Sequence, residues 1–88
     1  MNMAYEHPEH YMQIALQQAA LAALANEVPI GAVAVCVQTG QVLAQAHNQT
    51  ITLHDPTAHA EMLAIRQVCA QAKAQRVPDI DVYITLEP

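Results

Sequence analysis

The chain is 88 residues long, which is enough for one small domain, and no repeat or linker divides it. Hydrophobic residues make up 53% of it, which excludes a disordered tail, while no apolar run is long enough to cross a membrane. The formal charge of −5, with only 3 Lys or Arg residues, provides no basic patch for gripping phosphates, and the lack of a signal or transit peptide predicts a cytoplasmic protein.

The first predicted element is a helix over residues 9–26, a stretch rich in Ala and Gln, which both favour helices. Asn26 and then Pro29 mark its end. The apolar residues that recur at helical spacing, and are therefore predicted to face the core, are Met12, Ala15, Leu16, Ala19, Ala23 and Leu24.

Two strands are predicted next. Residues 30–37 form a continuous apolar run with β-branched side chains, which is typical of a strand buried on both faces. Thr39 and Gly40 supply a turn, so residues 42–47 are predicted to return as the second strand of a hairpin. Residues 48–53 are polar and are predicted to form a loop.

A second helix is predicted to begin at Asp55 and Pro56, because Asp is a preferred N-cap and Pro is tolerated at the first helical position. It runs to about Lys73, with a predicted apolar face of Met62, Leu63, Ile65, Val68, Cys69 and Ala72. Cys36 and Cys69 are predicted to be buried core residues. A third strand over residues 81–86 completes the order helix, strand, strand, helix, strand, which predicts an α/β layered domain.

Residues 54–61 carry the groups with the clearest chemical potential, His59 and Glu61. A neutral imidazole is a good zinc ligand, and a nearby carboxylate can carry protons to and from water that zinc activates. Both residues fall in the first turns of the predicted helix, whose side chains lean toward its N-terminus, so both could reach a site there. The His-x-Glu spacing decides little alone, because positions two apart on a helix point to different sides.

Three segments of the chain make the His-x-Glu pair of His59 and Glu61 more significant. They are VPIGA at residues 28–32, DPTAHAEM at residues 55–62 and YITLEP at residues 83–88. Zinc deaminases carry His-x-Glu followed by Pro-Cys-x-x-Cys, and here the second segment supplies His-Ala-Glu while the third ends on the proline. In order and spacing, the three segments together resemble the bacterial tRNA adenosine deaminase family of the cytidine deaminase-like superfamily.

The resemblance implies a three-layer α/β/α fold, of which this chain supplies the N-terminal α-β-β-α-β portion. It implies that His59 is a zinc ligand, that Glu61 is the catalytic general acid and base, and that Asn48 contacts the flipped base. The implied reaction converts adenosine to inosine at the wobble position of a tRNA anticodon, through attack of zinc-activated water on C6. Judged apart from the resemblance, His59 could cap its own helical turn, Glu61 could be a solvated carboxylate, and Asn48 could be a left-handed turn residue.

The match stops at Pro88, before the two cysteines that should complete the zinc site. Residues 1–88 are therefore expected to form a single incomplete nucleobase deaminase domain, with one Zn²⁺ ion whose two further cysteine ligands lie beyond Pro88. Cys36 and Cys69 cannot replace them, because neither lies in a C-x-x-C. The resemblance also implies a tRNA substrate, a homodimer and no membrane association.

Two alternative functions stay open. Guanine deaminases share the run DPTAHAE, and the deaminase domain of riboflavin synthesis shares TLEP, so the substrate could be guanine or another free nucleobase or nucleotide. In a second class, the chain is a catalytically inactive fragment or an association half, because a single histidine ligand cannot hold zinc tightly.

Overall fold

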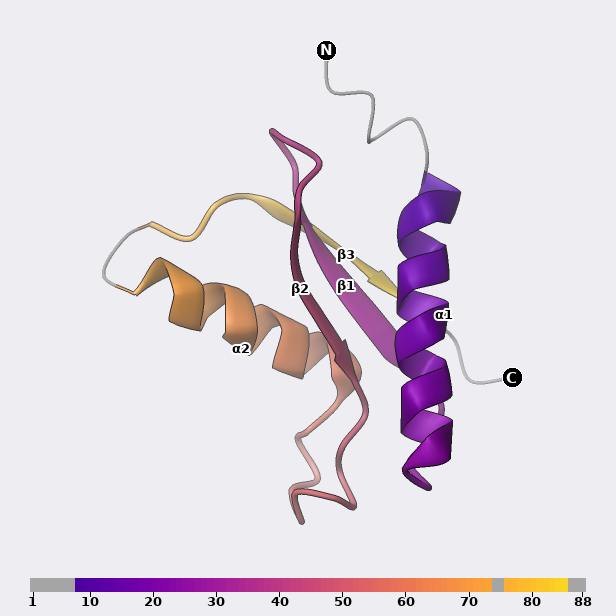
Figure 1. Ribbon diagram of the computed structural model, residues 1–88. Coiled ribbons are helices and arrows are strands. Elements are labelled where there is room, and N and C mark those ends of the chain that lie inside the picture. The colour runs from indigo at the N-terminus through magenta and orange to yellow at the C-terminus, as the bar shows by residue number, and fades with distance from the viewer. Residues whose placement is uncertain (1–7, 74–75, 86–88) are drawn as a thin grey trace.

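The computed structural model describes residues 8–73 and 76–85. It contains the helices α1 (Pro8–Leu24) and α2 (Ala60–Ala72) and the strands β1 (Gly31–Cys36), β2 (Val42–His47) and β3 (Ile80–Ile84) (Figure 1). The predicted order of elements is confirmed. Within the described residues, no helix combines the length and the apolar character that crossing a membrane requires.

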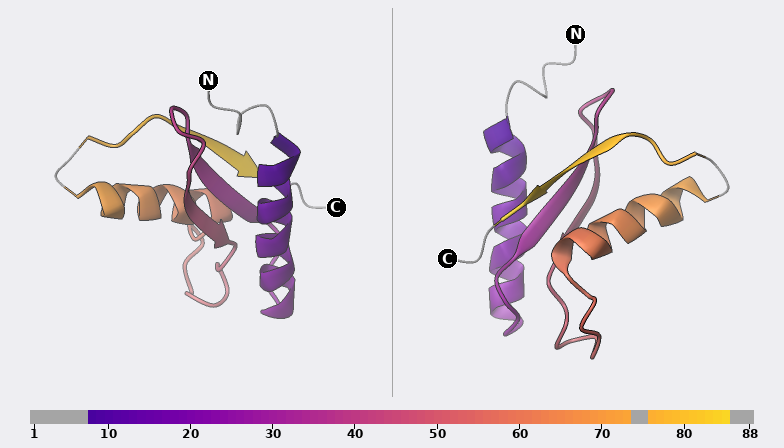
Figure 2. Two further views of the ribbon diagram at one scale, coloured as in Figure 1. Left: turned by 45° about the horizontal axis from the view of Figure 1, so that its top comes forward. Right: turned by 180° about the vertical axis from the view of Figure 1, so that it is seen from behind.

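The three strands form one sheet in the order β2-β1-β3, and β1 is antiparallel to both neighbours. All six residues of β1 are buried, which confirms the predicted strand with two covered faces. Seen from behind, β3 runs in front of β1 (Figure 2). Because β1 runs opposite to its neighbours, its first residue, Gly31, lies at the end of the sheet where β2 and β3 finish.

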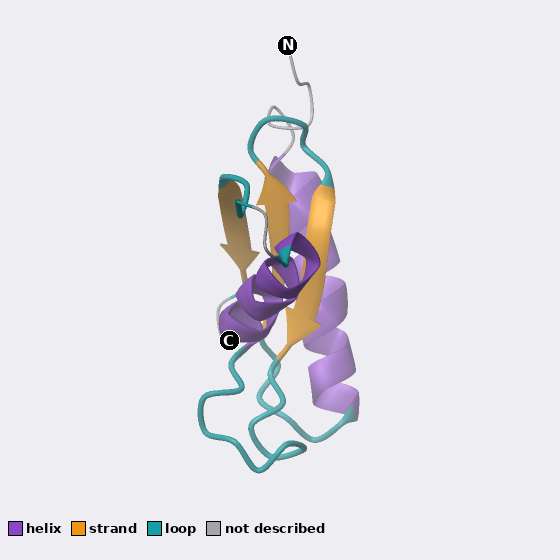
Figure 3. Ribbon diagram, turned by 90° about the vertical axis from the view of Figure 1, so that its left-hand side faces the viewer, coloured by secondary structure: helices purple, strands orange, loops and turns teal. Residues whose placement is uncertain are grey.

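The helices cover opposite faces of this sheet (Figure 3). Val33 and Val35 of β1 point to one face and pack with Tyr11 of α1. Ala32 and Ala34 point to the other face and pack with the buried side of α2. This alternation of side chains along β1 gives three layers, α1, sheet and α2, so the predicted α/β/α arrangement is confirmed.

The contact between α1 and the sheet is very close, and it explains an error in the predicted apolar face of α1. A Cβ atom at Gly31 would lie 2.0 Å from the carbonyl oxygen of Ala15, so only glycine fits there. This approach requires small side chains where α1 passes Gly31, and Ala15 and Ala19 are buried there as predicted. The rest of the buried side consists of Tyr11 and Ala22. Leu16 and Leu24, predicted to face the core, are 54% and 82% exposed.

The start of α2 differs from the prediction. The helix begins at Ala60 with His59 as its N-cap, and not at Asp55 and Pro56. The carboxylate of Asp55 instead accepts bonds from the amide and the hydroxyl of Thr57, at 2.8 and 2.7 Å. Asp55 therefore closes a local turn, which competes with helix formation. The loop predicted over residues 48–53 consequently extends to the start of α2.

The buried face of α2 consists of Ala60, Ala64 and Val68. Met62 and Cys69 are exposed, so their predicted place in the core is wrong, whereas Cys36 is buried as expected. Leu63 packs against this buried face, whereas Met62 faces outward. Within the third predicted strand, residues 81–84 belong to β3, and Leu86 lies outside the described residues.

Candidate functional site

Four chain segments meet at the end of the sheet where β1 begins. The amide of Asn48, just after β2, donates to the carbonyl of Ile30 at 3.0 Å. The amide of Thr85, just after β3, donates to the carbonyl of Gly31 at 3.0 Å, and the hydroxyl of Thr85 accepts from the amide of Gly31 at 2.9 Å. The side chain of Asn48 then reaches the first residue of α2, Ala60. All three residues singled out from the sequence therefore lie on segments that converge here.

His59 precedes the first helical residue, with an extended backbone at φ −76° and ψ 151°. Its amide donates to the carbonyl of Thr57 at 2.8 Å, which fixes the backbone at the entry to α2. The imidazole makes no capping hydrogen bond and is exposed, so the capping interpretation of His59 is wrong. An exposed imidazole without a capping bond is chemically suited to bind a metal ion.

Glu61 lies in the first turn of α2 and is half-buried. A carboxylate at this position is stabilised by the positive end of the helix dipole. Among the described residues, no hydrogen bond or ion pair engages the carboxylate of Glu61. It therefore has the freedom that a proton carrier needs, and that a solvated first-turn carboxylate would also have.

Asn48 is 3% exposed and does not have a positive φ, so its interpretation as a left-handed turn residue is wrong. Its side chain meets the amide of Ala60 at 3.0 Å, and because that amide is a donor, the facing atom must be Oδ1. This bond satisfies one of the free amides at the start of α2. Within the described residues Nδ2 has no acceptor, so Asn48 retains a donor for a ligand.

A metal ion at this place would need more ligands than the described residues provide. Within residues 8–73 and 76–85, no three of His, Cys, Asp or Glu are grouped closely enough to hold one. The donor chemistry of His59 fits zinc, but a catalytic zinc site uses three protein ligands. Thr85 lies at this end of the sheet, and the Leu86-Glu87-Pro88 segment that follows it lies outside the described residues.

The sequence analysis did not identify Glu27, whose side chain is only 5% exposed. Its carboxylate accepts bonds from the amides of Ile51 and Thr52 and from the hydroxyl of Thr52. Burial raises the pKa of Glu27, but the hydrogen bonds from Thr52 and Ile51 outweigh it and leave the pKa below its ordinary value. Its partners lie 24 and 25 positions away along the chain, so no local pattern indicated this contact.

A family model described as the cytidine and deoxycytidylate deaminase zinc-binding region matches residues 5–88. The tRNA-specific adenosine deaminase of Agrobacterium fabrum is 47% identical over 79 residues, which are 90% of this chain and 51% of that protein. The tRNA-specific adenosine deaminase of Aquifex aeolicus is 41% identical over 80 residues, which are 91% of this chain and 52% of that protein. The chain thus spans about half the length of these relatives.

Two solved structures share the fold. One, from a study of A-to-I editing by tRNA:A34 deaminases at the wobble position of transfer RNA, is 45% identical, with a TM-score of 0.82 over 93% of this chain and 62% of that chain. Guanine deaminase from Bacillus subtilis is 35% identical, with a TM-score of 0.76 over 91% of this chain and 50% of that chain. Because the family model covers nearly all of its residues, the chain belongs to the cytidine and deoxycytidylate deaminase zinc-binding family.

Proposed function

We propose that the protein deaminates adenosine to inosine by hydrolysis, at the wobble position of a tRNA anticodon, with one zinc ion. The observation that carries this proposal is the convergence of Asn48, His59 and Glu61 at one end of the sheet. The relatives named tRNA-specific adenosine deaminase support the choice of substrate. Residues 1–88 would then form the N-terminal part of one deaminase domain.

Each of the three residues has a separate role in this reaction. His59 would hold the zinc ion together with two cysteine ligands that residues 1–88 do not supply. Bound zinc would supply Lewis acidity, which lowers the pKa of water toward neutral. Glu61 accepts a proton from the attacking water and delivers it to the departing ammonia, so that C6 of adenine exchanges its C–N bond for a C–O bond. Nδ2 of Asn48 donates a hydrogen bond to the base.

The partners and the location are part of the same proposal. With 3 Lys or Arg residues, the 88 residues offer few contacts to phosphates, so most of the tRNA would be held by other residues or by a second copy in a homodimer. A tRNA substrate also fits a cytoplasmic location.

The substrate is tested with the protein as its gene encodes it, purified with zinc. It is incubated with an anticodon stem-loop that carries adenosine at the wobble position and, separately, with free guanine. Inosine in the RNA supports the proposal. Xanthine alone favours the second candidate, a guanine deaminase, to which the similarity to the Bacillus subtilis enzyme points. Deamination of neither substrate favours the catalytically inactive form.

Two substitutions test the assigned roles. Glu61→Gln removes the proton carrier and should lower kcat by roughly 10²- to 10⁴-fold with zinc content unchanged. His59→Ala removes a metal ligand and should lower both zinc content, measured by mass spectrometry, and activity. Zinc content that is unaffected by His59→Ala would contradict its role as a ligand.

His10→Ala provides the matched control for loss of an exposed histidine. The neighbouring Tyr11 donates to the carbonyl of Gly40 in the hairpin turn, at the opposite end of the sheet from the site. Activity and zinc content should therefore stay within twofold of the unchanged protein.

A further inference from the structure

Glu27 is held in a defined place by the end of α1. Asn26 has a φ of 60°, and its amide donates to the carbonyl of Ala23 at 3.1 Å. The amide of Glu27 donates to the carbonyl of Ala22 at 2.9 Å. This pair of bonds is a Schellman motif, which terminates a helix with one left-handed residue. The backbone of Glu27 is therefore part of the helix end rather than of a free linker.

From this position the side chain of Glu27 reaches the loop between β2 and α2. One carboxylate oxygen accepts from the amide of Ile51 at 3.1 Å, and the other accepts from the amide and the hydroxyl of Thr52, both at 2.6 Å. Burying a carboxylate is costly unless strong donors replace its water. All three donors come from the same two residues, so the favourable interaction of the charge depends on the loop keeping its shape.

The loop held by Glu27 is the segment that connects Asn48 to His59. Its two ends are joined where the amide of Gln49 donates to the carbonyl of Ala58, at 3.0 Å. Between these ends the chain makes turns only and has no helix or strand, as the long loops at the lower end of Figure 3 illustrate. Glu27 attaches the middle of this loop to the end of α1. The shape of the loop thus depends on a contact from outside it.

We propose that Glu27 is a positioning residue for the site, which fixes this loop so that Asn48 and His59 keep their relative placement. It does so without touching the substrate, because its carboxylate is buried against Ile51 and Thr52. The catalytic consequence rests on the proposed function, whereas the order of the loop can be measured without any substrate.

The test compares Glu27→Gln with two variants of its partner, Thr52→Val and Thr52→Ser, which change the contact less. All are made in the protein as its gene encodes it. Glu27→Gln keeps the shape of the side chain but removes the charge and places an NH₂ group among the loop donors. Thr52 is exposed, so its variants should fold, and only Thr52→Ser retains the hydroxyl. Amide exchange at Ile51 and Thr52, zinc content, kcat and KM are measured well below the unfolding temperature.

The expected result for Glu27→Gln is exchange at Ile51 and Thr52 that is roughly tenfold faster, with kcat/KM roughly tenfold lower and the zinc content unchanged. Thr52→Val should change both quantities in the same direction, and Thr52→Ser should restore them to within twofold of the unchanged protein. A structural role alone would lower the unfolding temperature without this dependence of kcat/KM on the hydroxyl.

Unchanged exchange at Ile51 and Thr52 in both Glu27→Gln and Thr52→Val would overturn the proposal, as would faster exchange with unchanged kcat/KM. If the unchanged protein deaminates no substrate, the proposed function fails. The exchange measurement then decides alone whether Glu27 orders the loop.

Discussion

At the scale of single residues, Asn48 combines two tasks in one amide group. Oδ1 accepts from the amide of Ala60 and so fixes the start of α2, where His59 and Glu61 lie. Nδ2 has no acceptor among the described residues and is available to a base. The proposed substrate contact and the placement of the proposed metal ligand would therefore depend on the same side chain.

Two substitutions of Asn48 separate these tasks. Asn48→Asp keeps an oxygen facing the amide of Ala60, at the positive end of the α2 dipole, and removes the NH₂ donor, so the start of α2 should be retained while kcat/KM falls at least about tenfold. Asn48→Ala removes both groups and should also cost about 1–2 kcal/mol in the free energy of unfolding. Urea denaturation and steady-state kinetics provide the measurements. Full activity in Asn48→Asp would show that Nδ2 does not bind the base.

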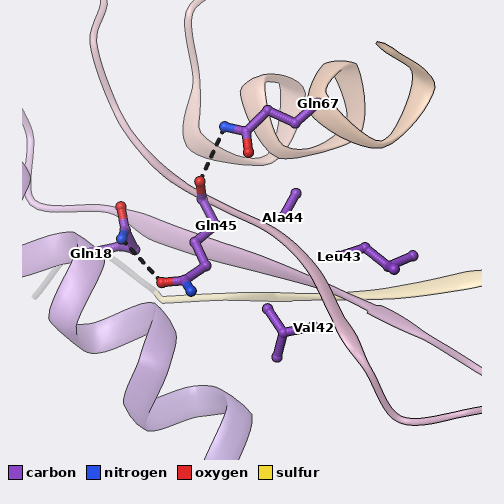
Figure 4. Close-up of a pocket in the computed structure, with 6 residues that line it drawn as sticks. All are labelled: Gln18, Val42, Leu43, Ala44, Gln45 and Gln67. Atoms are coloured by element: carbon purple, nitrogen blue, oxygen red, sulfur yellow. Dashed lines mark hydrogen bonds between the residues drawn. The ribbon is translucent and has the colours of Figure 1, made fainter. Parts of the chain in front are cut away.

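At the scale of elements, glutamine side chains cover the outer edge of β2. Gln67 and Gln71, one turn apart on α2, donate to the carbonyls of Gln45 and Leu43 at 3.1 and 2.8 Å. The amide of Asn48 donates to Ile30 at the start of β1, and alternate residues of an antiparallel strand bond to the same neighbour. The carbonyls of Gln45 and Leu43 therefore face away from β1. Figure 4 shows Gln67 above the edge and Gln18 bonded to the side chain of Gln45, beside an open pocket of about 320 Å³.

Free carbonyls on an edge strand invite pairing with another chain, and these glutamines reduce that risk. Replacing Gln67 and Gln71 together with Ala preserves helix propensity and adds no large apolar surface. We expect the average molecular mass of the variant, measured by light scattering, to rise with concentration above that of the unchanged protein. The matched control replaces Gln13 and Gln17, an exposed pair with the same spacing on α1. An equal rise in this control would exclude the edge as the cause.

The existence and order of the elements could be predicted because periodicity and turn residues are local signals. The buried face of α1 could be predicted only in part: Ala15 and Ala19 are buried as expected, but Leu16 and Leu24 are not, because the backbone at Gly31 approaches α1 too closely for large side chains. That distance favours Ala over Leu, against the usual ranking of hydrophobic burial. The start of α2 was missed for a related reason, since the turn closed by Asp55 competes with a cap.

The site shows the same difference between features that local sequence signals predict and features that depend on distant contacts. His59 and Glu61 could be proposed from the sequence because the family motif that contains them is contiguous. Glu27 could not, because its importance depends on partners in a loop more than 20 positions away. A buried carboxylate directly after a helix end is a signal only once its burial is known.

At the scale of the whole molecule, two carboxylates link stability to pH. Burial opposes ionisation of Glu27, but the bonds from Thr52 and Ile51 prevail and lower its pKa below 4.5. The hydroxyl and then the amide of Thr57 lower the pKa of Asp55 below 3.8. Because both pKa values are lower in the folded than in the unfolded state, the unfolded state binds more protons at acid pH. Their contribution is complete above the unfolded values and is lost as the pH falls through the folded ones.

The free energy of unfolding should therefore change little from pH 7 to about pH 5 through these two groups, and then fall steadily below pH 4.5. The double variant Glu27→Gln/Asp55→Asn has neutral side chains at both positions, which do not titrate. Its loss of stability between pH 5 and pH 3 should therefore be smaller than that of the unchanged protein. Urea denaturation across this range measures the difference, and other carboxylates cancel because both proteins contain them. Parallel curves would mean that neither charge is held more strongly in the folded state. A difference would show that part of the acid sensitivity of the fold comes from the contacts that Glu27 and Asp55 make with the loop between Asn48 and His59.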